Sequence, residues 1–446
     1  MQSTKAAEGP VLMPRTAWIA LGVFMLFYMM NALDRLLPSL MVKNIKADLS
    51  IDDLQMSLIM GVAFALFYAI WGLPFGWILD QAPRRIVLYF AVTLWSCAMI
   101  ACGLANNFTQ LFFARMILGA GEAALAPAAH SMLADIFPKR KLATALSVFT
   151  TGAALGTGLS ISLGGLAVAH LTQYQWVELP LLGNVRGWQL LFIICGAPGL
   201  FLAFLVFAFP EPPRPIKAEK GKPRESLLPF LRQPVFIFLA GSFGVFSMVP
   251  YGVNLWVAAF MDRTFGMGPG VAGPLLGAID IFAVIAGTIG AGSIVDRLVS
   301  RGQYDGYLRV FLISIIVGAP IGAIGFLSSD LPTFLLCLTI LKFATFTFIG
   351  YGAATFQAIS PNAMRGRMSA VYLLMLATIG NGGGPFLIGW LTDKALGNPN
   401  QLGTAIAIMI ASVTPIAAVS AWLGLKPLHA AVARQNEPAT QSAGAA

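Results

Sequence analysis

The sequence has 446 residues and a formal net charge of +9; 57% of its residues are hydrophobic and 11% are charged. Because a soluble domain carries about 25% charged residues, this composition excludes an ordinary water-soluble globular protein. The three His residues show no metal-ligand spacing, and no G-x-x-x-x-G-K-S/T phosphate loop is present. We therefore expect no enzyme, no catalytic residue, no metal, no cofactor and no ATP-driven pump.

Apolar segments long enough to cross a bilayer follow one another along the whole chain. Twelve spans lie near residues 17–42, 55–79, 86–105, 109–135, 142–169, 188–209, 234–260, 271–295, 309–328, 332–358, 368–392 and 402–425. Alternating, strand-like segments are lacking, so the spans must be helices to satisfy their backbone in lipid. The sequence predicts an all-α integral membrane protein with twelve transmembrane helices.

A segment rich in Pro, Lys and Arg interrupts the apolar pattern at its centre. It divides the prediction into an N-terminal six-helix bundle (1–209), a cytoplasmic linker (210–233) and a C-terminal six-helix bundle (234–430). The small, polar residues of 431–446 predict a disordered tail.

The 28 Lys and Arg residues are distributed unevenly between the two sides of the predicted membrane. If the N-terminus is cytoplasmic, the bases of the outer segments are Lys43, Lys46, Arg186, Arg263 and Lys394, and most others lie inside. By the positive-inside rule we expect a multi-pass protein of the plasma (inner) membrane with both termini in the cytoplasm. The net charge then reflects topology and contact with anionic membrane lipids, and not binding to nucleic acid.

Charged residues nevertheless occur inside the first and fourth spans. The stretch NALDRLLP carries Asp34 and Arg35, and each ionised residue at bilayer depth costs about 2.5–3.5 kcal/mol. At a rise of about 1.5 Å per residue, Asp34, Arg35 and Arg115 lie roughly 10 Å from the outer end of their spans, and Glu122 lies two turns deeper on the face of Arg115. Glu122 lies nearest the midplane, where loss of water favours a protonated carboxyl, whereas Arg35 and Arg115 lie at the depth of Asp34, so we expect Asp34 to stay ionised more firmly than Glu122.

The C-terminal half carries a second candidate pair and several polar residues. Asp280 and Lys342 both lie about 15 Å from the outer end of their spans, which favours an ion pair that is either a structural clamp or part of a substrate site. The residues that could line a cavity, or instead join helices, are Tyr251, Asn254, Trp256 and Thr345.

An internal repeat relates the two halves. The segment LIMGVAFALFYAIWGLPFGWILDQ aligns with PLLGAIDIFAVIAGTIGAGSIVDR, so that Asp80 matches Asp296 at the end of a G-x-x-x-D string. Parallel repeats of two six-helix halves are typical of the major facilitator superfamily. The string GWILDQAPRR resembles that superfamily's loop motif between its second and third helices, and GSIVDRLVSR resembles the second copy.

The superfamily resemblance implies a role for these motif residues. They would form a cytoplasmic latch, that is, a contact between the two halves on the cytoplasmic side, made by Asp80, Arg84, Arg85, Asp296 and Arg297. The first copy departs from the pattern at Gln81 and Pro83, which replace a base and a Gly. The alternative is a charged loop that only sets topology.

Four further strings resemble the spinster-type branch of the superfamily. They are NALDRLLPSLMVKNIKADLSIDDLQMSLIMGVAFALFYAIWGLPFG, RMILGAGEAALAPAAHSMLADIFPKRKLATALSVFTTGAALG, NLWVAAFMDRTFGM and GNGGGPFLIGWLTD. Sugar-acid and organic-anion symporters of the same superfamily carry a similar Asp-Arg pair and R-x-x-x-G-x-G-E-A string. The resemblance therefore implies the fold and the branch more strongly than the substrate.

The branch implies a monomeric transporter that works by alternating access and moves an amphipathic lipid, such as a lysophospholipid or sphingoid lipid, together with protons. Glu122 is our first candidate for the proton carrier and Asp34 our second, with Arg35 and Arg115 binding the substrate. One alternative is a proton-coupled symporter of a small organic anion or sugar acid. Another is a non-transporting membrane sensor, in which the charges form a static network.

Overall fold

The computed structural model describes residues 14–174, 176–180, 183–212, 228–360 and 364–436. Among these residues, 11 helices are long and apolar enough to cross a membrane. The remaining predicted span, near 332–358, consists of α15 (Leu331–Thr345) and α16 (Thr347–Ala358), which meet at Phe346. The predicted twelve-helix membrane architecture is confirmed.

The described residues divide into two compact units. Of the described residues, unit 1 comprises 14–50, 63–174, 176–180, 183–212 and 269–277, and unit 2 comprises 51–62, 228–268, 278–360 and 364–436. These units follow the two predicted halves, except that each includes one short segment of the other half. Residues 213–227 of the expected linker lie outside the described residues.

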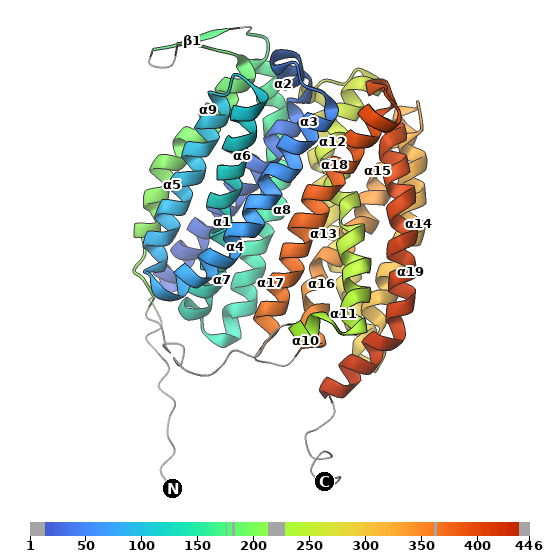
Figure 1. The fold of residues 1–446 in the computed structure, drawn as a ribbon. Coiled ribbons are helices and arrows are strands. Elements are labelled where there is room, and N and C mark those ends of the chain that lie inside the picture. The colour runs from blue at the N-terminus through green and yellow to red at the C-terminus, as the bar shows by residue number, and fades with distance from the viewer. Residues whose placement is uncertain (1–13, 175, 181–182, 213–227, 361–363, 437–446) are drawn as a thin grey trace, which may run out of the picture. The chain divides into compact units, whose positions relative to one another are not determined.

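Unit 1 is a bundle of helices with one small β-hairpin (Figure 1). Its helices are α1 (Pro14–Leu40), α2 (Val42–Leu49), α4 (Ala63–Gln81), α5 (Arg84–Gly103), α6 (Phe108–Glu122), α7 (Leu125–Ile136), α8 (Lys139–Leu171) and α9 (Gly187–Leu202), with a 3-10 turn at Ala203–Phe207. Strands β1 (Val177–Leu179) and β2 (Gly183–Val185) pair antiparallel between α8 and α9, with Val177 opposite Val185. This hairpin is a small addition to the expected all-α fold.

Unit 2 is also helical, and several of its helices contain π-helical turns. Its elements are α3 (Asp53–Ser57), α10 (Leu228–Leu231), α11 (Pro234–Leu239), α12 (Met248–Phe265), α13 (Pro269–Ser300) from residue 278 onward, α14 (Gly306–Phe326), α15, α16, α17 (Arg365–Met375), α18 (Gly384–Trp390) and α19 (Leu402–Asn436), with π-helical turns at Leu58–Val62, Ala240–Gly244, Leu376–Gly383 and Leu391–Ala395 and a 3-10 turn at Pro399–Gln401.

Helix α19 corrects the predicted tail. It continues to Asn436, so residues 431–436 are helical and not disordered. The stretch HAAVARQN contains good helix formers, which let the last span continue past the membrane. Residues 437–446 lie outside the described residues.

Segment 51–62 is fixed within unit 2 by polar contacts. Both terminal nitrogens of Arg263 donate to the carboxylate of Asp53, each at 2.7 Å. The main-chain N–H of Leu54 donates to Asp393 at 2.5 Å. Because the Arg263–Asp53 contact uses two parallel, charge-assisted hydrogen bonds, it is among the stronger polar contacts that a protein makes.

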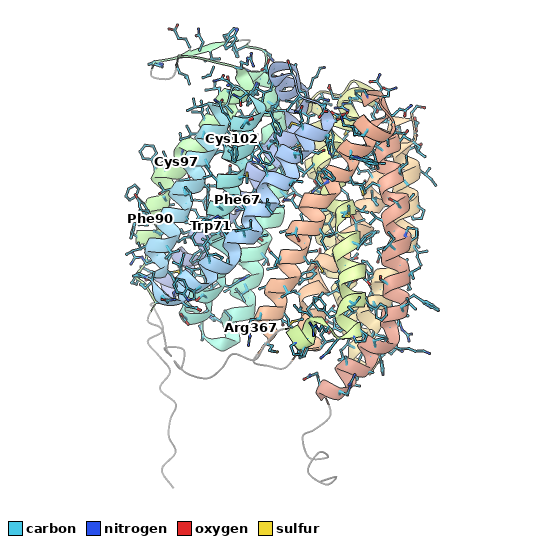
Figure 2. All side chains as sticks on the ribbon, viewed as in Figure 1. Phe67, Trp71, Phe90, Cys97, Cys102 and Arg367 are labelled. Atoms are coloured by element: carbon cyan, nitrogen blue, oxygen red, sulfur yellow. The ribbon has the colours of Figure 1, made fainter. Side chains whose placement is uncertain are left out.

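Large apolar side chains are exposed on the outer faces of the helices. Phe201 on α9 is 75% exposed, and Phe282 on α13 is 67% exposed. Phe90 and Cys97 on α5 also lie at the surface (Figure 2). Such a surface is unfavourable in water but suits a bilayer, where lipid chains cover it.

Glycines let neighbouring helices of unit 1 pack closely. A Cβ on Gly119 of α6 would collide with the main-chain carbonyl of Phe64 on α4. In the same way, Gly152 and Gly156 on α8 lie against Met25 and Met29 on α1. Small residues of this kind permit close backbone contact between membrane helices.

We predict that Gly119→Ala lowers the thermal stability of the purified protein, because the added methyl group forces α4 and α6 apart. Overpacking of this kind costs about 1–3 kcal/mol. The matched control is Gly22→Ala on α1, where a Cβ would meet nothing within 4 Å. A thermal unfolding curve in detergent should shift for Gly119→Ala only; equal curves for both variants would contradict the prediction.

Candidate functional site

An ion pair between Arg35 and Glu122 lies inside unit 1. Nε of Arg35, on α1, donates to Oε2 of Glu122, at the end of α6, at 2.8 Å. The Glu122 side chain is 0% exposed, whereas the Arg35 side chain is 32% exposed. The second oxygen of Glu122, Oε1, has no hydrogen-bond partner among the described residues, although the Asn31 side chain lies close to this carboxylate. The carboxylate is thus fully enclosed, while the guanidinium remains partly accessible.

Two aromatic rings cover the Arg35 guanidinium. Its central carbon lies 4.6 Å from the ring centroid of Phe64 and 4.9 Å from that of Tyr68. Both rings belong to α4, one turn apart, and contacts of this geometry attract a cation to the face of the ring. The sequence analysis missed these two residues, although the F-x-x-x-Y spacing on a span was a usable signal.

Arg115 is buried beside Asp34. Its Nη1 donates to the main-chain carbonyl of Asp34 at 2.9 Å. The side chain is 0% exposed, yet its Nε and Nη2 have no hydrogen-bond partner among the described residues. Asp34 is itself buried and lies within the electrostatic range of Arg35, Arg115 and Glu122.

The structure therefore brings the four charged residues of the N-terminal half together in one cluster, as the sequence predicted. Arg35 bonds Glu122 and not Asp34, although Asp34 precedes it in sequence. Consecutive side chains of a helix point about 100° apart, so Asp34 and Arg35 face different neighbours. Each base is thereby directed to a different acceptor.

A second buried ion pair lies inside unit 2. Nζ of Lys342, on α15, donates to Oδ1 of Asp280, on α13, and to Oδ1 of Asn254, on α12, the latter at 2.8 Å. The side chains of Lys342 and Asp280 are each 1% exposed. A narrow crevice between α12 and α15 reaches this pair, and Asn254, Lys342 and Thr345 contribute to its wall.

Two other residues expected to line a cavity lie elsewhere. Trp256 is fully buried, and the Arg263 guanidinium lies 5.6 Å from its ring centroid. Trp256 follows Asn254 by two positions, so it points about 200° away around the helix. Tyr251 packs near Gly380, and neither aromatic residue lines the crevice at Lys342.

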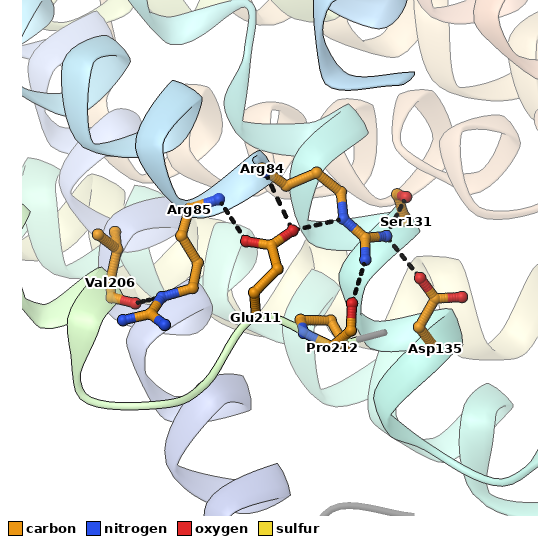
Figure 3. A network of polar contacts seen from close by, with 7 residues as sticks. All are labelled: Arg84, Arg85, Ser131, Asp135, Val206, Glu211 and Pro212. Carbon is orange, nitrogen blue, oxygen red and sulfur yellow. Dashed lines mark hydrogen bonds and ion pairs between the residues drawn. The ribbon is translucent and has the colours of Figure 1, made fainter. Parts of the chain in front are cut away.

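Arg84, at the start of α5, is the centre of a polar network in unit 1 (Figure 3). Its Nη1 donates to Ser131 at 2.8 Å and to Asp135 at 2.5 Å. Its Nε donates to Glu211 at 3.2 Å, and its Nη2 donates to the carbonyl of Pro212 at 2.9 Å. Arg84 is 2% exposed, so these contacts enclose it.

Glu211 extends the network to Arg85. Its carboxylate accepts the main-chain N–H groups of Arg84 and Arg85, each at 3.0 Å, where the positive end of the α5 dipole favours an anion. The Arg85 guanidinium donates to the carbonyl of Val206 at 2.8 Å. Thus both bases assigned to the latch have partners within their own unit.

The sequence analysis missed the acids of this network. Glu211 and Asp135 lie at the ends of the sixth and fourth spans, on the side predicted for Arg84, and this shared position was the available signal. The other latch candidates, Asp80, Asp296 and Arg297, are exposed near the ends of α4 and α13. Within the described ranges, no group of His, Cys, Asp and Glu residues could hold a metal ion.

Comparison with known proteins identifies relatives along most of the chain. An MFS-type efflux pump of Mycolicibacterium smegmatis is 27% identical over 419 residues, covering 92% of this chain and 93% of the pump. A D-galactonate transporter of Escherichia coli is 24% identical over 388 residues, covering 80% of this chain and 85% of the transporter.

The fold resembles that of a solved spinster-type protein. The crystal structure of a bacterial homologue of the human lysosomal transporter spinster, in an inward-facing and unoccupied conformation, has a TM-score of 0.80 and 23% identity, covering 96% of this chain and 100% of that one. The resemblance expected from the sequence strings is thereby confirmed at the level of the fold.

A family model also matches residues 19–385, and it is that of the Major Facilitator Superfamily. The twelve-helix architecture, the relatives and this match agree, and they describe a transporter and not an enzyme. The chain belongs to the Major Facilitator Superfamily.

Proposed function

We propose that this protein is a proton-coupled secondary transporter of an amphipathic lipid with an anionic headgroup, and that it works by alternating access. The observation that carries the proposal is the Arg35–Glu122 pair, in which a buried carboxylate holds a partly exposed guanidinium. Glu122 is the proton carrier, and Arg35 and Arg115 bind the headgroup.

Proton binding and anion binding are linked through this pair. A proton on Glu122 removes the negative charge that Arg35 contacts, and Oε1, which the bond to Arg35 does not use, can receive it. Hydrogen bonds to charged groups contribute about 1.5–3 kcal/mol, so their weakening releases Arg35 for a phosphate or carboxylate. By reciprocity, an anion bound to Arg35 favours the proton on Glu122 by the same factor.

Arg115 provides the second headgroup contact in this proposal. Its buried Nε and Nη2 are donors without partners among the described residues. A guanidinium presents its donors as a rigid fork that matches the oxygens of phosphate and carboxylate. Asp34, which lies beside Arg115, is the second candidate for the proton carrier.

The aromatic cover of Arg35 supports an amphipathic substrate, because the rings of Phe64 and Tyr68 place apolar surface next to the headgroup site. The spinster resemblance implies a lysophospholipid or sphingoid lipid. A small organic anion or sugar acid is the second candidate, favoured by the similarity to the D-galactonate transporter. A non-transporting sensor has no support from the relatives named above.

The proposal includes the cellular setting. The protein lies in the plasma (inner) membrane as a monomer, with both termini in the cytoplasm, in contact with anionic lipids of the inner leaflet. The excess of Lys and Arg in alternate connecting segments supports this orientation.

Vesicles containing the purified protein can test the function. With a pH gradient imposed, we expect movement of a fluorescent lysophosphatidylglycerol, and little movement when the gradient is collapsed. Radiolabelled D-galactonate is measured in the same vesicles. If the gradient drives galactonate and leaves the lysolipid in place, the second candidate replaces the first.

We predict that Glu122→Gln, which mimics the protonated form, still binds substrate but loses the response of transport to the pH gradient. Arg115→Ala is expected to lose transport itself. Glu178→Gln, on the exposed part of β1, makes the same chemical change away from the site and serves as the control. If Glu122→Gln vesicles respond as wild type does, Glu122 is structural, and Asp34→Asn becomes the variant to measure.

The latch generates a separate prediction. We propose that Asp80, Asp296 and Arg297 stabilise closure of the cytoplasmic side, and that Arg84 and Arg85, which are bonded within unit 1, hold the start of α5 in place. Asp80→Ala should therefore shift the protein toward its inward-open state. Distances between spin labels on the cytoplasmic ends of the two halves report this shift, with Glu178→Ala as the control. Unchanged distances would leave Asp80 with a role in topology only.

A further inference from the structure

We infer that Lys342 and Asn254 form a second anion-binding site, in unit 2, where a ligand's phosphate or carboxylate displaces Asp280 from Lys342. The inference rests on the transport function proposed above, since the anion is that of the substrate. It concerns other residues, however, and a different binding step.

The Lys342 ammonium is a buried cation whose bond to Asp280 can be exchanged for a bond to another anion. Lys342, Asp280 and Asn254 come from three different helices and meet at one ammonium group. An ammonium is a compact point charge with three rotatable donors, so it can exchange one acceptor for another without a fixed orientation. Asn254 remains as a neutral acceptor while the exchange takes place.

The pair is poorly explained as a clamp alone. Oδ2 of Asp280 is buried and has no hydrogen-bond partner among the described residues. A buried carboxylate in a purely structural role normally has both oxygens satisfied. Replacement of a buried ion pair by apolar residues is often neutral or stabilising, so helix packing by itself does not require these charges.

The crevice leads toward Lys342 but is closed in this structure, where the ammonium is buried, so a ligand reaches it only when α12 and α15 move apart. Its wall includes the apolar side chains of Val249, Val253 and Leu341, with Asn254 and Thr345 near the ammonium. A ligand with an apolar part and a single anionic group matches this arrangement. The shared chemistry is a phosphate or carboxylate, whether it belongs to a lipid or to a small soluble anion.

Asp280 competes with the ligand for Lys342, and removal of its charge provides the test. Asp280→Asn keeps the size and one acceptor oxygen of the side chain but ends the competition. We expect this variant of the full-length protein to bind lysophosphatidylglycerol about tenfold more tightly than wild type, measured by equilibrium binding in detergent. A structural clamp predicts the opposite pattern, with reduced thermal stability and unchanged affinity, and that result would overturn the inference.

The double variant Asp280→Asn/Lys342→Gln keeps the test decisive if the single variant folds poorly, because it buries no unpaired charge. We expect it to fold and to bind the lysolipid at least tenfold more weakly than wild type. The matched control is Asp305→Asn/Arg309→Gln, which neutralises another ion pair of unit 2 outside the crevice. Wild-type affinity in the first double variant would also overturn the inference.

Probe choice distinguishes the source of the anion. Tighter binding of lysophosphatidylglycerol alone by Asp280→Asn assigns the site to an amphipathic ligand, whereas tighter binding of D-galactonate and inorganic phosphate as well assigns it to anions in general. No gain with any probe overturns the site, and gradient-driven transport by wild type would then still support the proposed function. Conversely, a gain in affinity without gradient-driven transport would retain the site and reject proton coupling.

Discussion

A charge inside a bilayer must find its partner within the protein, because lipid chains cannot solvate it. Three bases within the spans meet this requirement in different ways. Arg35 bonds Glu122 beneath two aromatic rings, Arg115 bonds a main-chain carbonyl, and Lys342 bonds both Asp280 and Asn254. Each unit thus contains a polar centre within an apolar bundle, and helices distant in sequence must meet at that centre.

The positions of the spans and the depths of their charged residues in the membrane could be predicted from the sequence. Both depend only on distance along a helix, which follows from the number of residues. Asp280 and Lys342 illustrate this, since equal depth and opposite sign in two spans anticipated their contact. Rotation around the helix was harder to predict. Arg35 bonds Glu122 and not Asp34, and Trp256 lies away from Asn254, because these outcomes depend on which neighbouring helix each face meets.

The network at Arg84 shows a second limit of sequence reasoning. The bases stood out as a motif, but the acids that bind them come from the ends of other helices. Asp135 lies 51 positions along the chain from Arg84, and Glu211 lies 127 positions away. No local pattern encodes such contacts. They form only when the ends of several helices come together in the folded protein. Here they connect the start of α5 to α7 and to the segment that follows the sixth span.

The division of one helical span between the two units has a mechanical consequence. Residues 53–81 form a single candidate span, yet the residues up to Val62 belong to unit 2 and those from Ala63 onward belong to unit 1. A rearrangement of the units must therefore either bend this span or detach its first turns from Arg263. The π-helical turn Leu58–Val62 ends at the boundary, where the wider hydrogen-bond spacing makes bending easier than in a regular α-helix. The span can therefore bend at Leu58–Val62 while its first turn stays bonded to Arg263 through Asp53.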